Sequence, residues 1–97
     1  MDHYTQASEL VSELKENLRV GWDDDENLKR YLVRSMSRLD DLIGLPVDYT
    51  TDESAKDLLF NRVRYDYNAS AEYWLDNFRE DILQLQFKYA VEAMRDD

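Results

Sequence analysis

The sequence predicts an all-α protein, and three observations support this fold class. The chain has 97 residues but only two glycines and one proline, whereas β-sheet proteins need many tight turns. Apolar residues recur every three or four positions along most of the chain, which is the helical period. Hydrophobic residues make up 43% of the chain, enough for one core at this length. We therefore expect a single helical domain over residues 1–97, approximately a four-helix bundle.

The first helix is expected over residues 8–19, after a loose tail formed by residues 1–6. Within this segment, apolar residues recur at helical spacing: Leu10, Val11, Leu14 and Leu18. The glycine of "VGW", Gly21, is a plausible stop, because glycine adopts the left-handed conformation that often ends a helix.

The second helix is expected over residues 24–43 and is the most clearly amphipathic one. It follows the acidic run "DDDEN", in which Asp23 or Asp24 can cap the helix while the other carboxylates favour the positive end of its dipole. Gly44 and Pro46 come directly after its last apolar residues, which is typical of a helix end.

A long third helix is expected over residues 52–76, opened by Thr51 or Asp52 as the capping residue. Its apolar stripe advances in steps of three or four residues through Phe60, Val63, Tyr67, Ala71, Trp74 and Phe78. The weak helix formers "NAS" at 68–70 are a place where this helix can kink or break.

The last helix is expected over residues 79–94, and apolar residues cover more than half of its circumference. Such a helix needs burial on more than one side. We expect the four helices to pack around Leu14, Leu32, Leu39, Phe60, Tyr67, Trp74 and Leu85.

Charge and composition exclude several classes of protein. Acidic residues outnumber basic ones by 22 to 12, for a net charge of −10, so nonspecific binding to nucleic acid or anionic membranes is disfavoured. The chain has no cysteine and therefore no disulfide or thiolate site. It has no apolar run of the roughly 20 residues that span a bilayer. We expect a soluble protein of the cytoplasm without a signal peptide.

The residues indicate no catalytic or metal site, and we expect no enzyme and no cofactor. His3 is the single histidine, and no phosphate-binding glycine loop or nucleophile motif is present. The acidic run from Asp23 does not follow the calcium-binding EF-hand pattern, because Leu28 stands where that loop needs glycine. The adjacent Glu80 and Asp81 diverge by about 100° on a helix and do not converge on one site.

Five residues are candidates for an interaction surface. Tyr65 and Tyr73 lie off the apolar stripe of the third helix. Tyrosine is enriched at protein interfaces, where its ring packs and its hydroxyl is exposed to water. Phe87, Val91 and Met94 lie on the side of the last helix furthest from Ile82, Leu85 and Tyr89, which we assign to the core. The apolar arc of this helix is wider than packing within one four-helix domain requires, so we expect these three residues to contact a neighbouring subunit or another protein, with Tyr65 and Tyr73 as rim contacts.

Two pairs of segments resemble the head–tail connector, or adaptor, proteins of tailed bacteriophages. In the first half, "LKENLRV" is followed by "DDDENLKRYLVRSMSRLDDLIG"; in the second, "NRVRYDYNASAEYWLDNF" is followed by "ILQLQFKYAVE". Each motif consists largely of residues that begin or end helices, but the order and spacing of the motifs match the family over about residues 10–93.

The resemblance implies an all-helical structural protein without catalytic residues or cofactors. Members of this family form a ring, usually of twelve subunits, that joins the portal protein to the next tail-side connector or stopper protein. DNA passes through the ring, so the implied location is the head–tail interface of the virion, reached from the host cytoplasm during assembly. An acidic surface suits such a channel, because carboxylates repel phosphate.

Two alternatives stay open from the residues alone. One is an acidic inhibitor that mimics DNA and occupies the basic groove of a nucleic-acid-binding protein, although here the acidic residues are interleaved with lysine and arginine. The other is a small helical subunit of an enzyme.

Overall fold

The computed structural model describes residues 2–95, and every regular element in that range is helical. The four longer helices are α1 (His3–Leu18), α2 (Asp25–Ile43), α3 (Glu53–Tyr67) and α5 (Arg79–Arg95). A short 3₁₀ turn, η1 (Ala71–Tyr73), and one turn of helix, α4 (Trp74–Asn77), lie between α3 and α5. The predicted all-α class is therefore confirmed.

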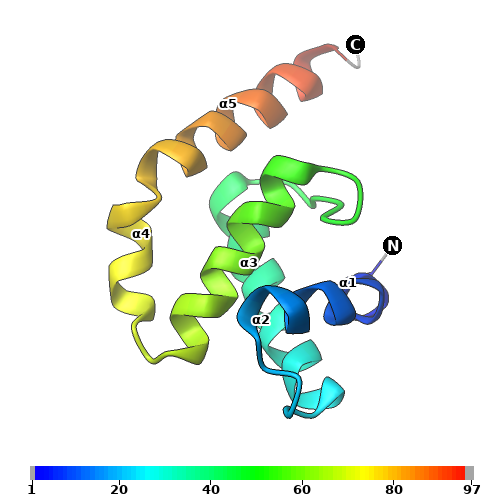
Figure 1. Ribbon diagram of the computed structural model, residues 1–97. Coiled ribbons are helices and arrows are strands. Elements are labelled where there is room, and N and C mark those ends of the chain that lie inside the picture. Colours follow the sequence, from blue (N-terminus) through cyan, green and yellow to red (C-terminus); the bar gives the residue numbers. More distant parts are fainter. Residues whose placement is uncertain (1, 96–97) are drawn as a thin grey trace.

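The helices are arranged around α2, which packs against α1, α3 and α5. In Figure 1, α3 lies in front of α2, and α5 crosses above them and extends to the C-terminal end of the chain. The molecule is elongated, with principal extents of 47 × 29 × 17 Å. The loop between α1 and α2 is at the lower end of the view and the end of α5 is at the upper end.

The first helix starts five residues earlier than the sequence suggested, and the expected loose tail at residues 1–6 is wrong for the described part, residues 2–6. Asp2 caps α1, accepting a hydrogen bond from the backbone N–H of Thr5 at 2.7 Å. Gln6 and Ala7 are both buried. Arg19, not Gly21, takes the left-handed conformation at the end of α1, with φ of 58°.

The second helix matches its prediction closely. Asp24 is its N-cap and accepts a hydrogen bond from the N–H of Glu26 at 3.1 Å. Gly44 ends the helix with φ of 94°, a left-handed value that glycine adopts without strain.

The expected long helix over residues 52–76 is wrong, because the chain breaks at "NAS". Asp52 caps α3 as one of the two expected candidates, but the helix ends at Tyr67 and Ala69 adopts φ of 56°. The break turns η1 and α4 back so that Trp74 enters the core with only 1% of its surface exposed. The ring of Trp74 stacks on that of Phe78 at a centroid distance of 6.1 Å.

Six of the seven predicted core residues are buried: Leu14, Leu32, Leu39, Phe60, Trp74 and Leu85. The exception is Tyr67, which is half-buried and donates a hydrogen bond from its hydroxyl to Asp23 Oδ2 at 2.7 Å. Tyr67 therefore anchors the α1–α2 loop at the edge of the core.

Candidate interaction surface

The side of α5 that faces the protein is fixed by packing and by hydrogen bonds. Ile82 and Leu85 are buried against the core. Gln86 Nε2 donates to the carbonyl of Leu42, at the end of α2, at 2.6 Å. Both Lys88 Nζ and the Tyr89 hydroxyl donate to Asp52 Oδ2, at 2.9 and 2.6 Å. These contacts set the rotation of α5 about its own axis.

Asp52 has two roles at this junction, because it also caps α3. Burial of the carboxyl group tends to raise the pKa of Asp52, but the hydrogen bonds from Tyr89, Lys88 and the α3 backbone outweigh burial and leave it below its ordinary value. Burial and the same carboxylate raise the pKa of the Tyr89 hydroxyl, which stays protonated and donates. The middle of α5 is therefore attached to the start of α3 by a charge-assisted contact.

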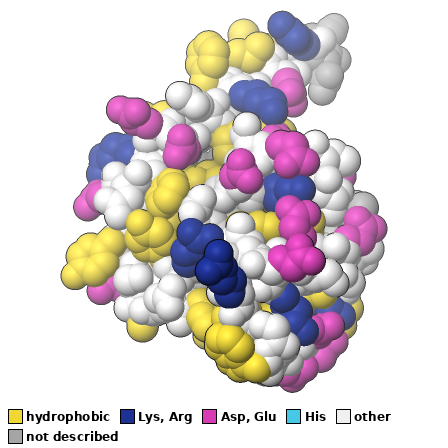
Figure 2. All heavy atoms as spheres, in the orientation of Figure 1, with side chains coloured by type: hydrophobic (Ala, Val, Ile, Leu, Met, Phe, Trp, Pro, Cys, Tyr) yellow, Lys and Arg dark blue, Asp and Glu magenta, His cyan; other side chains and the backbone are white. Residues whose placement is uncertain are grey.

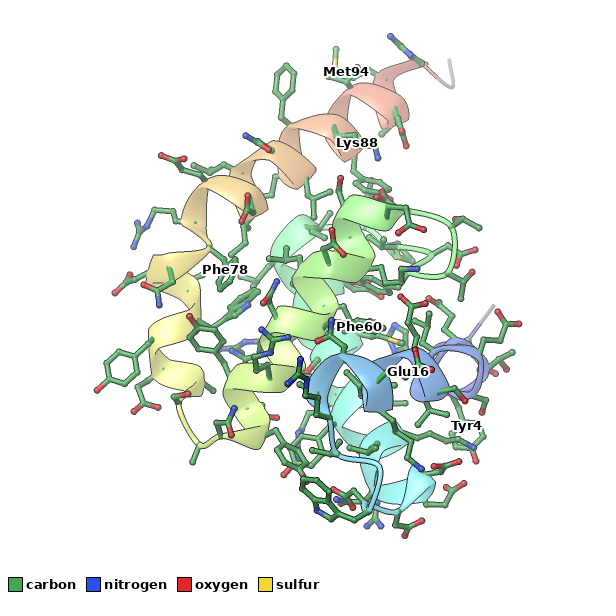
Figure 3. All side chains as sticks on the ribbon, in the orientation of Figure 1. Tyr4, Glu16, Phe60, Phe78, Lys88 and Met94 are labelled. Carbon is green, nitrogen blue, oxygen red and sulfur yellow. The ribbon has the colours of Figure 1, made fainter. Side chains whose placement is uncertain are left out.

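The opposite side of α5 presents an apolar stripe to solvent. Leu83, Phe87 and Met94 are 56%, 73% and 75% exposed, and Ala90 between them is also exposed. These four residues, spaced by four, three and four positions, fall within about 60° of the helix circumference. We call them the outer stripe. Figure 2 shows hydrophobic side chains near the end of α5, and in Figure 3 Met94 points away from the body of the protein.

The five residues predicted for the surface do not all lie together. Phe87 and Met94 belong to the outer stripe, whereas Val91 is half-buried. Tyr73, in η1, is 61% exposed. Tyr65 is half-buried and used within the chain: its ring meets Phe78 edge-on at 5.7 Å and its hydroxyl accepts a hydrogen bond from Asn77.

The prediction missed two exposed apolar residues near these positions. Leu83 lies in the outer stripe, and Leu75, in α4, is 46% exposed. The spacing of Leu83, Phe87, Ala90 and Met94 was a signal present in the sequence. This spacing places every residue of the outer stripe about 80° or more around the helix from the buried Ile82 and Leu85.

A second exposed apolar site was also missed, at the other end of the molecule. Trp22, in the α1–α2 loop, is 79% exposed. It borders a hollow of about 310 Å³ that is also lined by Leu18, Tyr67 and Arg64, among others. The loop is held in place by Asp23, which accepts hydrogen bonds from Tyr67 and from the side chain of Asn27. We call Trp22 and this hollow the Trp22 site.

No family model, no curated protein and no solved structure matches the chain. None of the helices within residues 2–95 is long and apolar enough to cross a membrane. The same residues contain no group of three or more histidine or acidic side chains placed to hold a metal ion. At the start of α2, the Asp23 and Asp24 carboxylates are engaged in hydrogen bonds to the backbone and to neighbouring side chains.

Proposed function

We propose that this protein is a structural connector that assembles head-to-tail into a ring between a phage portal and a tail-side connector or stopper protein. The family resemblance of the helical segments supports this role, and so does the placement of exposed apolar surface. The proposal includes no catalytic activity and no cofactor, and it treats DNA as passing through the ring without specific binding.

The observation that carries the proposal is the presence of two different apolar sites at opposite ends of the molecule. The outer stripe lies on α5, at the upper end in Figure 1, and the Trp22 site belongs to the loop at the lower end. A ring needs a heterologous contact, in which one surface of a subunit meets a different surface of the next. A convex apolar stripe and a hollow beside an exposed tryptophan are suited to such a contact.

We therefore propose that Phe87 and Met94 of one subunit enter the Trp22 site of the next. Exposed aromatic residues and methionine are enriched in interfaces, and an apolar group that fills a pocket of a neighbour contributes more than one on a flat rim. Val91 and Tyr73 then lie beside the contact, and Tyr65 supports it from within the subunit. The isolated protein is expected to be monomeric at low concentration and to self-associate only at high concentration, because a contact of this size is small and the portal serves as a template for the ring.

The test uses Phe87→Asp and Trp22→Asp, each of which removes one of the two sites. Both positions are more than 70% exposed, so both variants should stay folded. The portal protein encoded in the same genome is purified, and decoration of its rings is followed by electron microscopy and native mass spectrometry. Wild-type protein should form a closed ring on the portal. Leu45→Asp is the control, since Leu45 is a partly exposed apolar residue outside both sites.

Mixing the variants distinguishes a head-to-tail contact from a symmetric one. At concentrations at which the wild-type protein self-associates, neither variant alone should form dimers. A mixture should give dimers and nothing larger, because Phe87→Asp keeps the Trp22 site and Trp22→Asp keeps the outer stripe. If Trp22→Asp dimerises alone, the stripe pairs with itself and the ring proposal is wrong. If the protein does not bind portal rings but competes with DNA for binding to a basic protein, it is a DNA mimic instead.

A further inference from the structure

A hollow between α2 and α3 gathers three arginines in a protein that is otherwise strongly acidic. Arg34 and Arg38 come from α2 and Arg62 from α3, and they line a hollow of about 360 Å³. The remaining lining residues are Ser35, Ser37, Asp41 and Asp66. This cluster lies outside both apolar sites of the proposed ring contact.

Only one of the three arginines has a carboxylate partner among the described residues. Arg34 pairs with Asp66 at 3.1 Å. Arg38 and Arg62 make no hydrogen bond or ion pair with any residue from 2 to 95. The hollow therefore contains two guanidinium groups whose charge is not balanced by direct contact.

The base of the hollow also contains buried polar atoms without partners. Ser35 is 2% exposed, and its Oγ makes no hydrogen bond. Arg62 Nε is likewise buried and unpaired. Buried polar groups are nearly always hydrogen-bonded, so two such groups beside one hollow need an explanation.

Arg62 is held in position by packing. Its guanidinium lies over the ring of Trp74 at 5.1 Å, a cation–π contact with a fully buried indole. Burial lowers the pKa of Arg62, Asp66 opposes this change, and the nearby Arg38 and Arg34 lower the pKa further. A fixed and partly desolvated arginine binds an anion with little loss of side-chain entropy.

We propose that this hollow is an oxyanion site that binds a carboxylate side chain of a protein partner through Arg38 and Arg62. A guanidinium group presents its N–H donors in a planar fork that matches a carboxylate. The bound carboxylate would neutralise one of the two free positive charges and place an acceptor beside the unpaired Ser35 Oγ and Arg62 Nε. This inference does not rest on the proposed connector role.

A protein carboxylate fits the molecule better than a nucleic-acid backbone. A strand of nucleic acid brings many phosphates, and the net charge of −10 repels them at long range. The hollow has room and free donors for one anionic group. A single acidic side chain presented by a folded partner requires no extended basic surface.

The probe is a short blocked peptide of glutamate and aspartate, titrated into isotope-labelled full-length protein at constant ionic strength. Arginine Nε–Hε signals in NMR spectra report on binding, together with the indole signal of Trp74. The signals of Arg38 and Arg62 should shift and saturate. Arg38→Gln should weaken binding by about tenfold or more, as expected for loss of a charge-assisted contact. Arg95→Gln removes the same charge from the exposed end of α5 and should bind as wild type.

Separate titrations with sodium acetate, inorganic phosphate and a single-stranded oligonucleotide identify the source of the anion. Saturation by acetate and the acidic peptide supports a carboxylate site. Saturation by phosphate with no response to the peptide would indicate a site for a free anion and overturn the proposal. Tighter binding of the oligonucleotide would assign the site to nucleic acid instead. Linear shifts of all arginines together, equal in Arg38→Gln and Arg95→Gln, would mean that no site exists.

Discussion

Replacing Tyr49 with Phe tests a buried polar network that connects the start of α1, the end of α2 and the loop before α3. Tyr49 is fully buried in the loop before α3, and its hydroxyl donates to Asp40 Oδ1 at 2.8 Å. Asp40 also accepts from the N–H of Val47 and pairs with His3 at the start of α1. The backbone N–H of Tyr49 donates to the buried Gln6 at 2.8 Å. Tyr49→Phe removes one hydroxyl and keeps the packed ring.

The expected cost follows from the kind of hydrogen bond that is lost. A hydrogen bond to a charged group contributes about 1.5–3 kcal/mol to stability. In a domain of this size that loss lowers the melting temperature by roughly 6–24 °C, at about 4–8 °C per kcal/mol. It is also a large part of a total stability of about 5–15 kcal/mol. Chemical denaturation followed by circular dichroism measures the change directly.

Tyr4→Phe is the matched control, because it removes a hydroxyl that also contacts a carboxylate. The Tyr4 hydroxyl lies 3.1 Å from Glu26 Oε1, but the residue is 53% exposed. Its loss should change the free energy of unfolding by no more than about 0.5 kcal/mol. If Tyr49→Phe is equally mild, the network around Asp40 does not stabilise the fold and our account of the N-terminal segment is wrong.

Three further predictions follow from the core and from the capping carboxylates. Trp74→Ala should cost about 3–5 kcal/mol, as for other large buried aromatic residues, and an unchanged denaturation midpoint would contradict its place in the core. Millimolar calcium should not raise the melting temperature, because Asp23 and Asp24 already accept hydrogen bonds at the start of α2; a clear rise would indicate a metal site. The pKa of Asp52 is lowered in the folded state from its ordinary value of 3.8, so its stabilising effect is present at neutral pH and is lost as the pH falls below that value. Asp52→Asn should therefore be less stable than wild type at about pH 7, with a difference that closes towards about pH 2; a difference independent of pH would refute this.

Local signals in the sequence predicted most of the helices because these signals act over a few residues. In the structure, as predicted from the sequence, α2 begins after the acidic cap Asp24 and ends at Gly44. The weak helix formers at 68–70 marked the place where α3 ends. The apolar stripe from Phe60 to Phe78 continues through these residues and wrongly suggested one long helix. Trp74 instead reaches the core from a separate turn of helix, α4.

Contacts between distant residues could not be predicted in the same way. His3 and Gln6 are polar residues near the N-terminus, which is why the sequence suggested a loose tail. Their partners are Asp40 and the loop around Val47 and Tyr49, about forty positions away. No periodicity encodes such a pairing, so the order of the first helical turn depends on the complete fold.

The exposed apolar residues of α5 show how accurately helical periodicity in the sequence predicts which residues face solvent. The predicted set of Phe87, Val91 and Met94 assumed one face directly opposite the core. Residues at spacings of four, three and four form a face of the same width, about 60°, rotated by about 40°; this face includes Leu83 and Ala90 and leaves Val91 at its edge. Because Val91 is half-buried, an aspartate there would perturb both folding and contact, whereas Phe87, at 73% exposed, reports on contact alone. The exact rotation of α5 is determined by the hydrogen bonds of Gln86 and Tyr89 to α2 and to the α3 cap, and these tertiary contacts decide which apolar residues are left for a partner.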